Sequence, residues 1–139
     1  MTRKMTYLAV LSVLFVMGST AQAVVIDMNS PQDGLTVGRG DTIQMTVKLT
    51  NDTDIKDVVN VRFRMTLTGD DKSIVLQGRP MRLRMEPGQE LEWTVETTIP
   101  EFLPPLPTGP IDIVIIGRAE GLKSGTESND TVSFILDLS

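Results

Sequence analysis

The sequence predicts an all-β domain, and three observations carry that prediction. Apolar and polar residues alternate with a period of two in several segments, which places the apolar side chains on one face of a strand. Turn signals rich in Gly, Pro, Asn and Asp separate these segments at short intervals. After residues 1–23, no segment keeps a helical apolar period over the length of an ordinary helix.

The two clearest strands lie between Asp41 and Asn51 and between Val59 and Leu67, where every second residue is apolar. Each strand therefore has one face that must be buried, and two such faces need a second layer to cover them. The inward residues are Ile43, Met45, Val47 and Leu49 in the first strand and Val59, Val61, Phe63, Met65 and Leu67 in the second.

Further strands are indicated by the same alternation or by short apolar runs between turns. They are Val24 to Met28, Ser73 to Gln77, Pro80 to Met85, Glu90 to Thr97, Ile111 to Arg118 and Thr131 to Leu138. Seven to eight short strands in one domain are typical of an immunoglobulin-like antiparallel β-sandwich, here with a core centred on Trp93, Phe63 and Phe134. A closed barrel is the alternative.

Residues 1–23 have the three parts of an export signal. Arg3 and Lys4 form the basic start, the run from Tyr7 to Met17 is apolar, and an A-x-A cleavage site ends at Ala23. The apolar run is shorter than the ~20 residues that cross a bilayer, and no later stretch is long enough, so we expect no membrane span. We therefore expect a signal peptide over 1–23, one domain over 24–139, and a periplasmic or secreted product.

The composition narrows the possible functions because the chain contains no histidine and no cysteine. This excludes His-based triads, thiol nucleophiles, Cys/His zinc sites and disulfides, and we expect that the protein is not an enzyme. Removal of the signal takes away two of the 13 basic residues and leaves all 18 acidic ones. That acidic balance argues against nucleic acid as a partner.

Four segments stand out for their turn chemistry. They are Gly40-Asp41-Thr42 before a strand that closes on Asn51, Met85 to Trp93, Pro107-Thr108-Gly109 before the Ile-rich strand, and Glu127 to Thr131. Over roughly residues 36 to 138, the chain thereby resembles the cell-adhesion-related immunoglobulin-like domain found in bacteria. The resemblance implies an extracellular, non-catalytic interaction module and does not supply a ligand.

Two apolar features are candidate partner-binding surfaces. Val114 and Ile116 lie on the face of the Ile-rich strand opposite to its core face, with Ile135 as a neighbour from the last strand. The alternative is that another segment covers this stripe. Phe102, Leu103 and Leu106 belong to a stiff proline-rich segment, Pro100 to Pro110, and either plug one end of the sandwich or are presented to a partner.

An acidic loop end is the candidate metal site. If the strand order is immunoglobulin-like, the loops 52–57 and 120–130 share one end of the sandwich. Carboxylate oxygens are the ligands that Ca²⁺ prefers, whereas the alternative is ordinary turn chemistry. The candidate ligands are Asp52, Asp54, Asp57, Glu127 and Asp130. We expect no other cofactor.

Alternation also places arginines in pairs on outer faces of the predicted sheets. Arg62 and Arg64 share one such face, and Arg82 and Arg84 share another beside Glu92 and Glu96. We interpret these residues as solvated ion pairs.

Taken together, these features predict an exported, non-enzymatic protein-interaction, adhesion or assembly module. We expect a protein partner or self-association. The alternative is a small calcium- or carbohydrate-binding domain that uses the acidic loop end.

Overall fold

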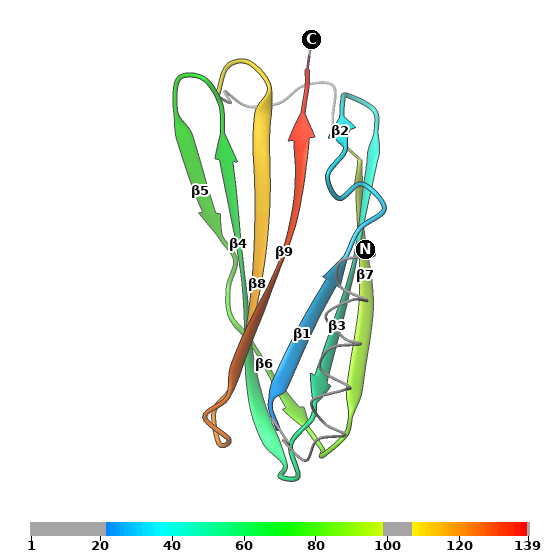
Figure 1. Cartoon of the computed structure of the whole chain (residues 1–139), viewed down its shortest axis with the longest axis vertical. Helices are drawn as coiled ribbons and strands as arrows, with labels where there is room; N and C mark the ends of the chain where they lie inside the picture. The colour runs from blue at the N-terminus through cyan, green and yellow to red at the C-terminus, as the bar shows by residue number, and fades with distance from the viewer. Residues whose placement is uncertain (1–21, 99–106, 139) are drawn as a thin grey trace, which may run out of the picture.

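A computed structural model of the chain describes residues 22–98 and 107–138. Within these residues the protein is all-β, and its strands form two sheets that face each other (Figure 1). Most of the predicted signal peptide and the three apolar residues Phe102, Leu103 and Leu106 lie outside the described residues.

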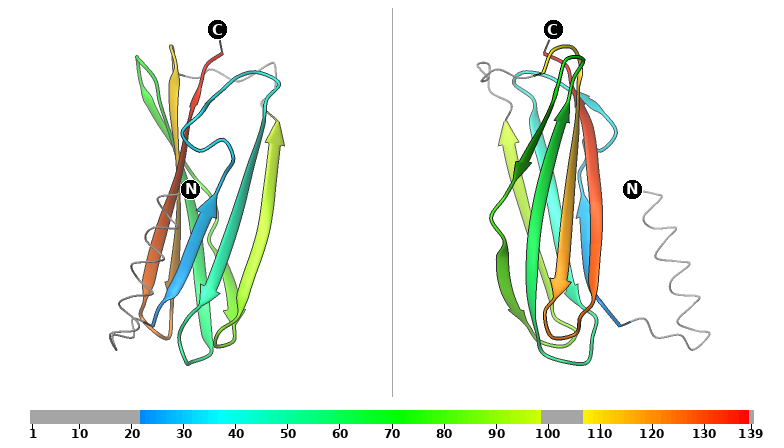
Figure 2. Two further views of the ribbon diagram at one scale, coloured as in Figure 1. Left: turned by 45° about the vertical axis from the view of Figure 1, so that its right-hand side comes forward. Right: turned by 90° about the vertical axis from the view of Figure 1, so that its left-hand side faces the viewer.

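A three-stranded sheet and a six-stranded sheet make up the two layers (Figure 2). The small sheet has the order β1 (Val24–Asn29), β3 (Thr42–Asn51), β7 (Glu90–Thr98). The large sheet has the order β2 (Thr36–Val37), β9 (Glu127–Leu136), β8 (Ile111–Gly121), β4 (Asp57–Thr68), β5 (Ser73–Gln77), and β6 (Met81–Met85) also pairs with β4. All pairs are antiparallel except β2 with β9.

This order is immunoglobulin-like, because β1, β3 and β7 form one sheet and face a sheet that contains β4, β8 and β9. The predicted fold is therefore confirmed. The structure differs in two details. The two-residue strand β2 is an additional, parallel strand, and β8 and β9 reach further into the predicted loop, to Gly121 and from Glu127.

The hydrophobic core lies between the sheets and consists of alternate residues of the long strands. Met28, Val47, Leu49, Val59 and Val61 are fully buried. Phe134 is buried as expected, whereas Trp93 and Phe63 are only partly buried. The centre of the core is consequently mostly aliphatic, and Trp93 and Phe63 lie at its margin.

One lateral side of the sandwich is closed by hydrogen bonds between the sheets. The backbone N–H groups of Val24, Ile26 and Met28 on β1 donate to every second side chain from the residue before β9 into its first half. The acceptors are Thr126 Oγ1 at 3.0 Å, Ser128 Oγ at 2.8 Å and Asp130 Oδ2 at 2.7 Å. These contacts occupy donors that an edge strand otherwise offers to another chain.

The opposite lateral side, between β7 and the strands β5 and β6, has no such closure within the described residues. Apolar side chains that share the inner faces of these strands stay partly or largely accessible there. Val95 is 47% exposed, Leu76 is 53% exposed and Met81 is 40% exposed. The two edges of the sandwich are therefore built differently.

Candidate functional site

The outer face of the six-stranded sheet carries a groove lined by arginine side chains. Register places side chains from β5, β4, β8 and β9 in rows across this face. Three successive rows are Val75–Thr66–Val114–Ser133, Gln77–Arg64–Ile116–Thr131 and Arg62–Arg118–Asn129. The second and third rows bring three arginines together from two strands.

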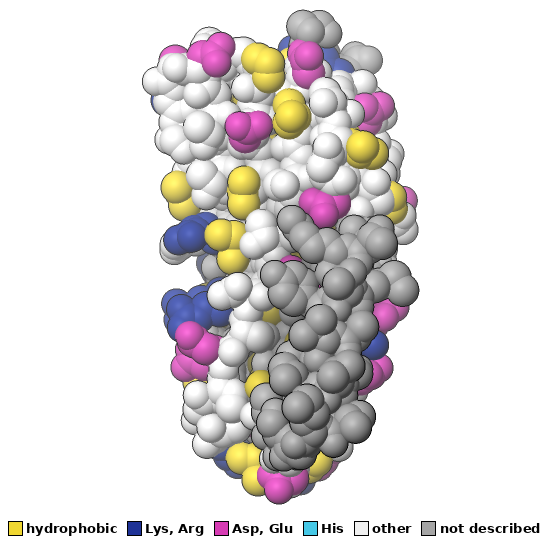
Figure 3. Space-filling view, viewed as in Figure 1, with side chains coloured by type: hydrophobic (Ala, Val, Ile, Leu, Met, Phe, Trp, Pro, Cys, Tyr) yellow, Lys and Arg dark blue, Asp and Glu magenta, His cyan; other side chains and the backbone are white. Residues whose placement is uncertain are grey.

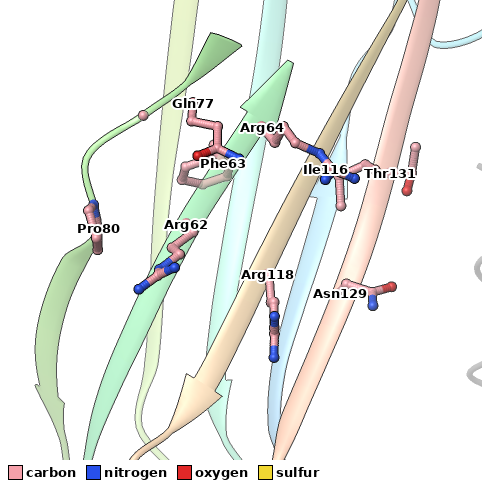
Figure 4. A pocket seen from close by; sticks show the side chains of 10 residues that line it. Arg62, Phe63, Arg64, Gln77, Pro80, Ile116, Arg118, Asn129 and Thr131 are labelled. Carbon is pink, nitrogen blue, oxygen red and sulfur yellow. The ribbon is translucent and has the colours of Figure 1, made fainter. Parts of the chain in front are cut away.

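These rows form the floor of a groove of about 510 Å³, which we call the basic groove. Figure 4 shows Arg62 and Arg64 on β4 and Arg118 on β8, with the Arg64 side chain extending towards Ile116. The full lining is Arg62, Phe63, Arg64, Gln77, Gly78, Pro80, Ile116, Arg118, Asn129 and Thr131. Figure 3 shows basic side chains gathered beside a notch at the left edge of the molecule. The volume lies within the usual range for small-ligand sites, roughly 300–1,000 Å³.

One wall of the groove exists because the edge of the sheet is interrupted between β5 and β6. Residues 78–80 separate the two strands, and both pair with β4 on either side of the interruption. The N–H of Gly78 donates to the carbonyl of Phe63 at 3.0 Å, which holds this segment against β4. Pro80 has no N–H to continue the ladder. Arg62 therefore has no paired residue on the β5–β6 side of β4, and the space beside it forms part of the groove.

The charges of the three arginines are satisfied unequally. Arg118 donates to the Glu127 carboxylate, and its Nη2 lies 3.7 Å from Oε2 of Glu120. The hydrogen bond to Glu127 and the negative charges of both glutamates raise the pKa of Arg118. Arg62 and Arg64 make no ion pair or side-chain hydrogen bond within the described part of the chain. Two guanidinium groups are thus available to an external anion.

A smaller hollow of about 80 Å³ adjoins the basic groove and shares Arg62 and Arg118 with it. Asn60 and Glu120 complete its lining. The Oδ1 atom of Asn60 is buried and accepts no hydrogen bond from the described residues. The hollow therefore combines a free acceptor with two positive groups.

The predicted apolar surface is partly recovered on this face. Val114 and Ile116 are half-buried on the outer side of β8, and Ile116 belongs to the basic groove. Ile135 is 36% exposed and lies opposite Asp112, away from the groove. Phe102, Leu103 and Leu106 are outside the described residues.

The predicted metal ligands are not brought together. Glu127 and Asp130 lie on β9 rather than in a loop, and their odd separation puts them on opposite faces of the strand. Glu127 pairs with Arg118, whereas Asp130 accepts the N–H of Met28. Asp52 and Asp54 are exposed between β3 and β4. Within the described residues no group of three or more acidic side chains could hold a metal ion.

Asp57, the fifth predicted ligand, is used by the fold itself. Its side chain is buried and accepts the backbone N–H groups of Val58, Lys123 and Ser124. Burial raises the pKa of Asp57, but the hydrogen bonds from Ser124, Lys123 and Val58 outweigh that effect and lower its pKa overall. The carboxylate therefore anchors the β8–β9 turn to the start of β4.

The interpretation of the arginines as ion pairs is wrong for both predicted pairs. Arg82 and Arg84 lie on β6 in the large sheet, whereas Glu92 and Glu96 lie on β7 in the small sheet. No ion pair joins these residues within the described chain. Sequence reasoning also missed Arg118, because its position beside Arg62 depends on the pairing of strands far apart in sequence.

Comparisons with known proteins support the fold. No family model and no curated protein matches the chain. Among solved structures, the alkylpurine DNA glycosylase AlkC from Pseudomonas fluorescens matches with 17% identity and a TM-score of 0.54, over 88% of this chain and 33% of that one. The sporulation control protein Spo0M from Bacillus subtilis matches with 15% identity and a TM-score of 0.50, over 84% of this chain and 50% of that one.

A third structure is the CARDB domain of a Pyrococcus furiosus protein in complex with di-metal ions. It has 16% identity and a TM-score of 0.49, over 84% of this chain and 94% of that one. The chain spans half the length of Spo0M and a third of the AlkC chain. At these identities the likenesses to AlkC and Spo0M show the β-sandwich fold alone.

The described residues contain no helix that is long and apolar enough to cross a membrane.

Proposed function

We propose that the chain is an exported, non-catalytic binding module whose basic groove holds an acidic segment of a partner protein. The observation that carries this proposal is the convergence of Arg62, Arg64 and Arg118 around one groove, where Arg62 and Arg64 have no ion-pair partner among residues 22–98 and 107–138. Guanidinium groups bind carboxylates through charge-assisted and often bidentate hydrogen bonds.

The surroundings of the arginines favour a peptide over other anions. Ile116 lies in the groove, and the neighbouring row adds Val75 and Val114, so a ligand that contacts both rows needs apolar as well as acidic groups. An extended peptide offers these groups along one chain. Sugar-binding sites commonly use stacked aromatics, whereas the single tryptophan, Trp93, belongs to the other sheet. A chain with a net charge of −5 is also poorly suited to nucleic acid.

The groove chemistry supports binding rather than catalysis. Its lining contains no carboxylate, and the chain has no histidine or cysteine. The nearest acids, Glu120 and Glu127, are paired with Arg118. General acid–base and nucleophilic catalysis need groups of these kinds within reach of a bound substrate.

Fluorescence anisotropy with a short labelled peptide of alternating Glu and Val residues tests the proposal. We expect Arg62→Ala and Arg64→Ala each to weaken binding about tenfold, because each removes a charge-assisted hydrogen bond. Lys72→Ala is the matched control, because it removes an exposed positive charge from the β4–β5 turn, outside the groove. We also expect binding to weaken in high salt.

Three results would contradict this proposal. The first is that the peptide does not bind, and the second is that Lys72→Ala weakens binding as much as Arg62→Ala does. The third is that a sulfated polysaccharide binds through the arginines whereas the peptide does not. The export part is tested separately, by sequencing the N-terminus of protein recovered outside the cytoplasm of an expressing cell. The expected first residue is Val24, and a retained Met1 would refute cleavage.

A further inference from the structure

The open lateral side of the sandwich combines a free strand edge with accessible apolar side chains. Among the strands of residues 22–98 and 107–138, β7 pairs with β3 alone, and β6 pairs with β4 alone. Val95, Met81 and Leu76 are exposed, although their strand partners Met45, Val61 and Met65 pack in or against the core. Uncovered inner-face side chains beside free edges are typical of a surface that another chain completes.

The two edges carry opposite charges on their outer faces. On β6, Arg82 and Arg84 alternate with inward apolar residues, and neither makes an ion pair within the described chain. On β7, Glu90, Glu92 and Glu96 alternate with inward apolar residues in the same way. Glu90 also lies 3.5 Å from Nζ of Lys48 on β3, an exposed pair that leaves its carboxylate accessible at the edge. Both edges lie on the same side of the molecule. The acidic edge of a second copy can therefore face β6 while its basic edge faces β7.

Strand direction permits this pairing. The short turn between Met85 and Glu90 joins β6 to β7 at one end of the sandwich, so the two strands run in opposite directions (Figures 1 and 2). A two-fold axis parallel to the strands therefore brings β7 of one copy beside β6 of the other as an antiparallel pair, and it does so twice. The contact is self-complementary and closed.

We infer that this open side is a homodimer interface, in which β6 of each copy pairs with β7 of the other. A register that faces Leu83 with Leu91 also sets Arg84 opposite Glu90 and Arg82 opposite Glu92. The inward side chains then bury one another, and each sheet of one copy continues into a sheet of the other. Pairing of β7 with itself would instead bring Glu against Glu, which is unfavourable. The inference does not depend on the proposed function of the basic groove.

Sedimentation velocity of the exported full-chain product, from about 1 to 200 μM, tests the inference. We expect the dimer mass in the upper part of this range. The double variant Arg82→Glu/Arg84→Glu gives both edges negative charge, and the double variant Glu90→Arg/Glu92→Arg gives both edges positive charge. Each variant alone is expected at the monomer mass, with a thermal melting curve that shows it is folded.

Mixing the two variants is the decisive step. Every β6–β7 contact between unlike variants joins opposite charges, so an equimolar mixture is expected to recover the dimer mass. A monomeric wild type across the whole range would overturn the inference, and so would folded variants that remain dimeric alone or fail to associate when mixed. Met81→Asp provides a second check, because Met81 is 40% exposed and the same register sets it opposite Trp93. The variant places a charge in the shared apolar layer without changing the outer faces, and it too is expected at the monomer mass.

Discussion

Asp57 is the residue whose replacement should most clearly separate a structural carboxylate from a metal ligand. It begins β4, and its Oδ1 accepts N–H groups from Val58 and Lys123, both at 2.8 Å, while Oδ2 accepts that of Ser124 at 3.2 Å. Two of these donors belong to the β8–β9 turn. Asp57→Asn keeps one acceptor oxygen but replaces the other with an amide nitrogen, which would face the N–H of Ser124 donor to donor.

The loss of stability follows from these bonds. A hydrogen bond to a charged group contributes about 1.5–3 kcal/mol, and a buried donor left without an acceptor costs about 1–3 kcal/mol. Because Lys123 is exposed, water can replace part of the lost bonding at the turn. We therefore expect Asp57→Asn to lower the free energy of unfolding by about 2–3 kcal/mol at pH 7, or the melting temperature by roughly 10 °C.

The pH dependence gives a second, independent test. The pKa of Asp57 is lowered in the folded protein, so its stabilisation is present in full above the unfolded pKa of about 3.9 and is lost as the pH falls through the lower folded value. The difference between wild type and Asp57→Asn should therefore shrink below about pH 4. Urea denaturation at pH 7 and near pH 3 measures it, with exposed Asp54→Asn as control. A loss below about 0.5 kcal/mol at pH 7, or an equal loss at both pH values, would refute the reasoning.

Two further substitutions test how the sheets are joined. Ser128→Ala removes the acceptor of the Ile26 N–H, so we expect a loss of about 1 kcal/mol and faster hydrogen exchange of that amide, whereas Ser133→Ala on the same strand should leave both unchanged. Gly117→Val should lower stability by about 2–3 kcal/mol, because a side chain there meets Met28, Ile26 and Phe63. Gly78→Ala is its control, since the nearest atom is 3.7 Å away. Equal melting temperatures for the two glycine variants would contradict the close packing of β1 on β8.

Strands with alternating apolar residues that face the core could be predicted from the sequence. A strand segment whose polar side chains form hydrogen bonds to another strand could not. β3 and most of β4 alternate apolar and polar residues, and both were predicted nearly to their ends. The start of β9 reads Glu127-Ser128-Asn129-Asp130-Thr131, which has no apolar alternation, so the sequence predicts a loop there. In the structure, alternate side chains of this segment accept hydrogen bonds from β1. Such side chains must be polar, so the segment shows no hydrophobic periodicity.

The candidate sites show the same limit. The metal site is predicted from acidic residues in segments expected to be loops. In the structure Glu127 and Asp130 lie on a strand and point to opposite faces of it, so they do not converge. Only part of the basic groove could be predicted. The alternation of residues along β4 places Arg62 and Arg64 on one face, but the position of Arg118 beside them depends on how β8 pairs with β4. Side chains on one strand can be placed from sequence, whereas neighbours across strands require the pairing.

The two lateral sides of the sandwich give the strongest physical reason to expect association. Natural sheets protect their edges, and this chain does so on the β1 side with Ser128, Asp130 and the threonine before β9. At β7 the hydroxyls of Thr94 and Thr98 bond instead to Thr46 and Thr42 within the same sheet, and inner-face apolar residues of the described structure stay accessible. In a monomer, apolar side chains at an open edge remain in contact with water and do not contribute to stability. A dimer that pairs this edge with β6 buries the exposed apolar surface and sets Arg82 and Arg84 opposite glutamates of β7, so the difference between the two sides locates the interface.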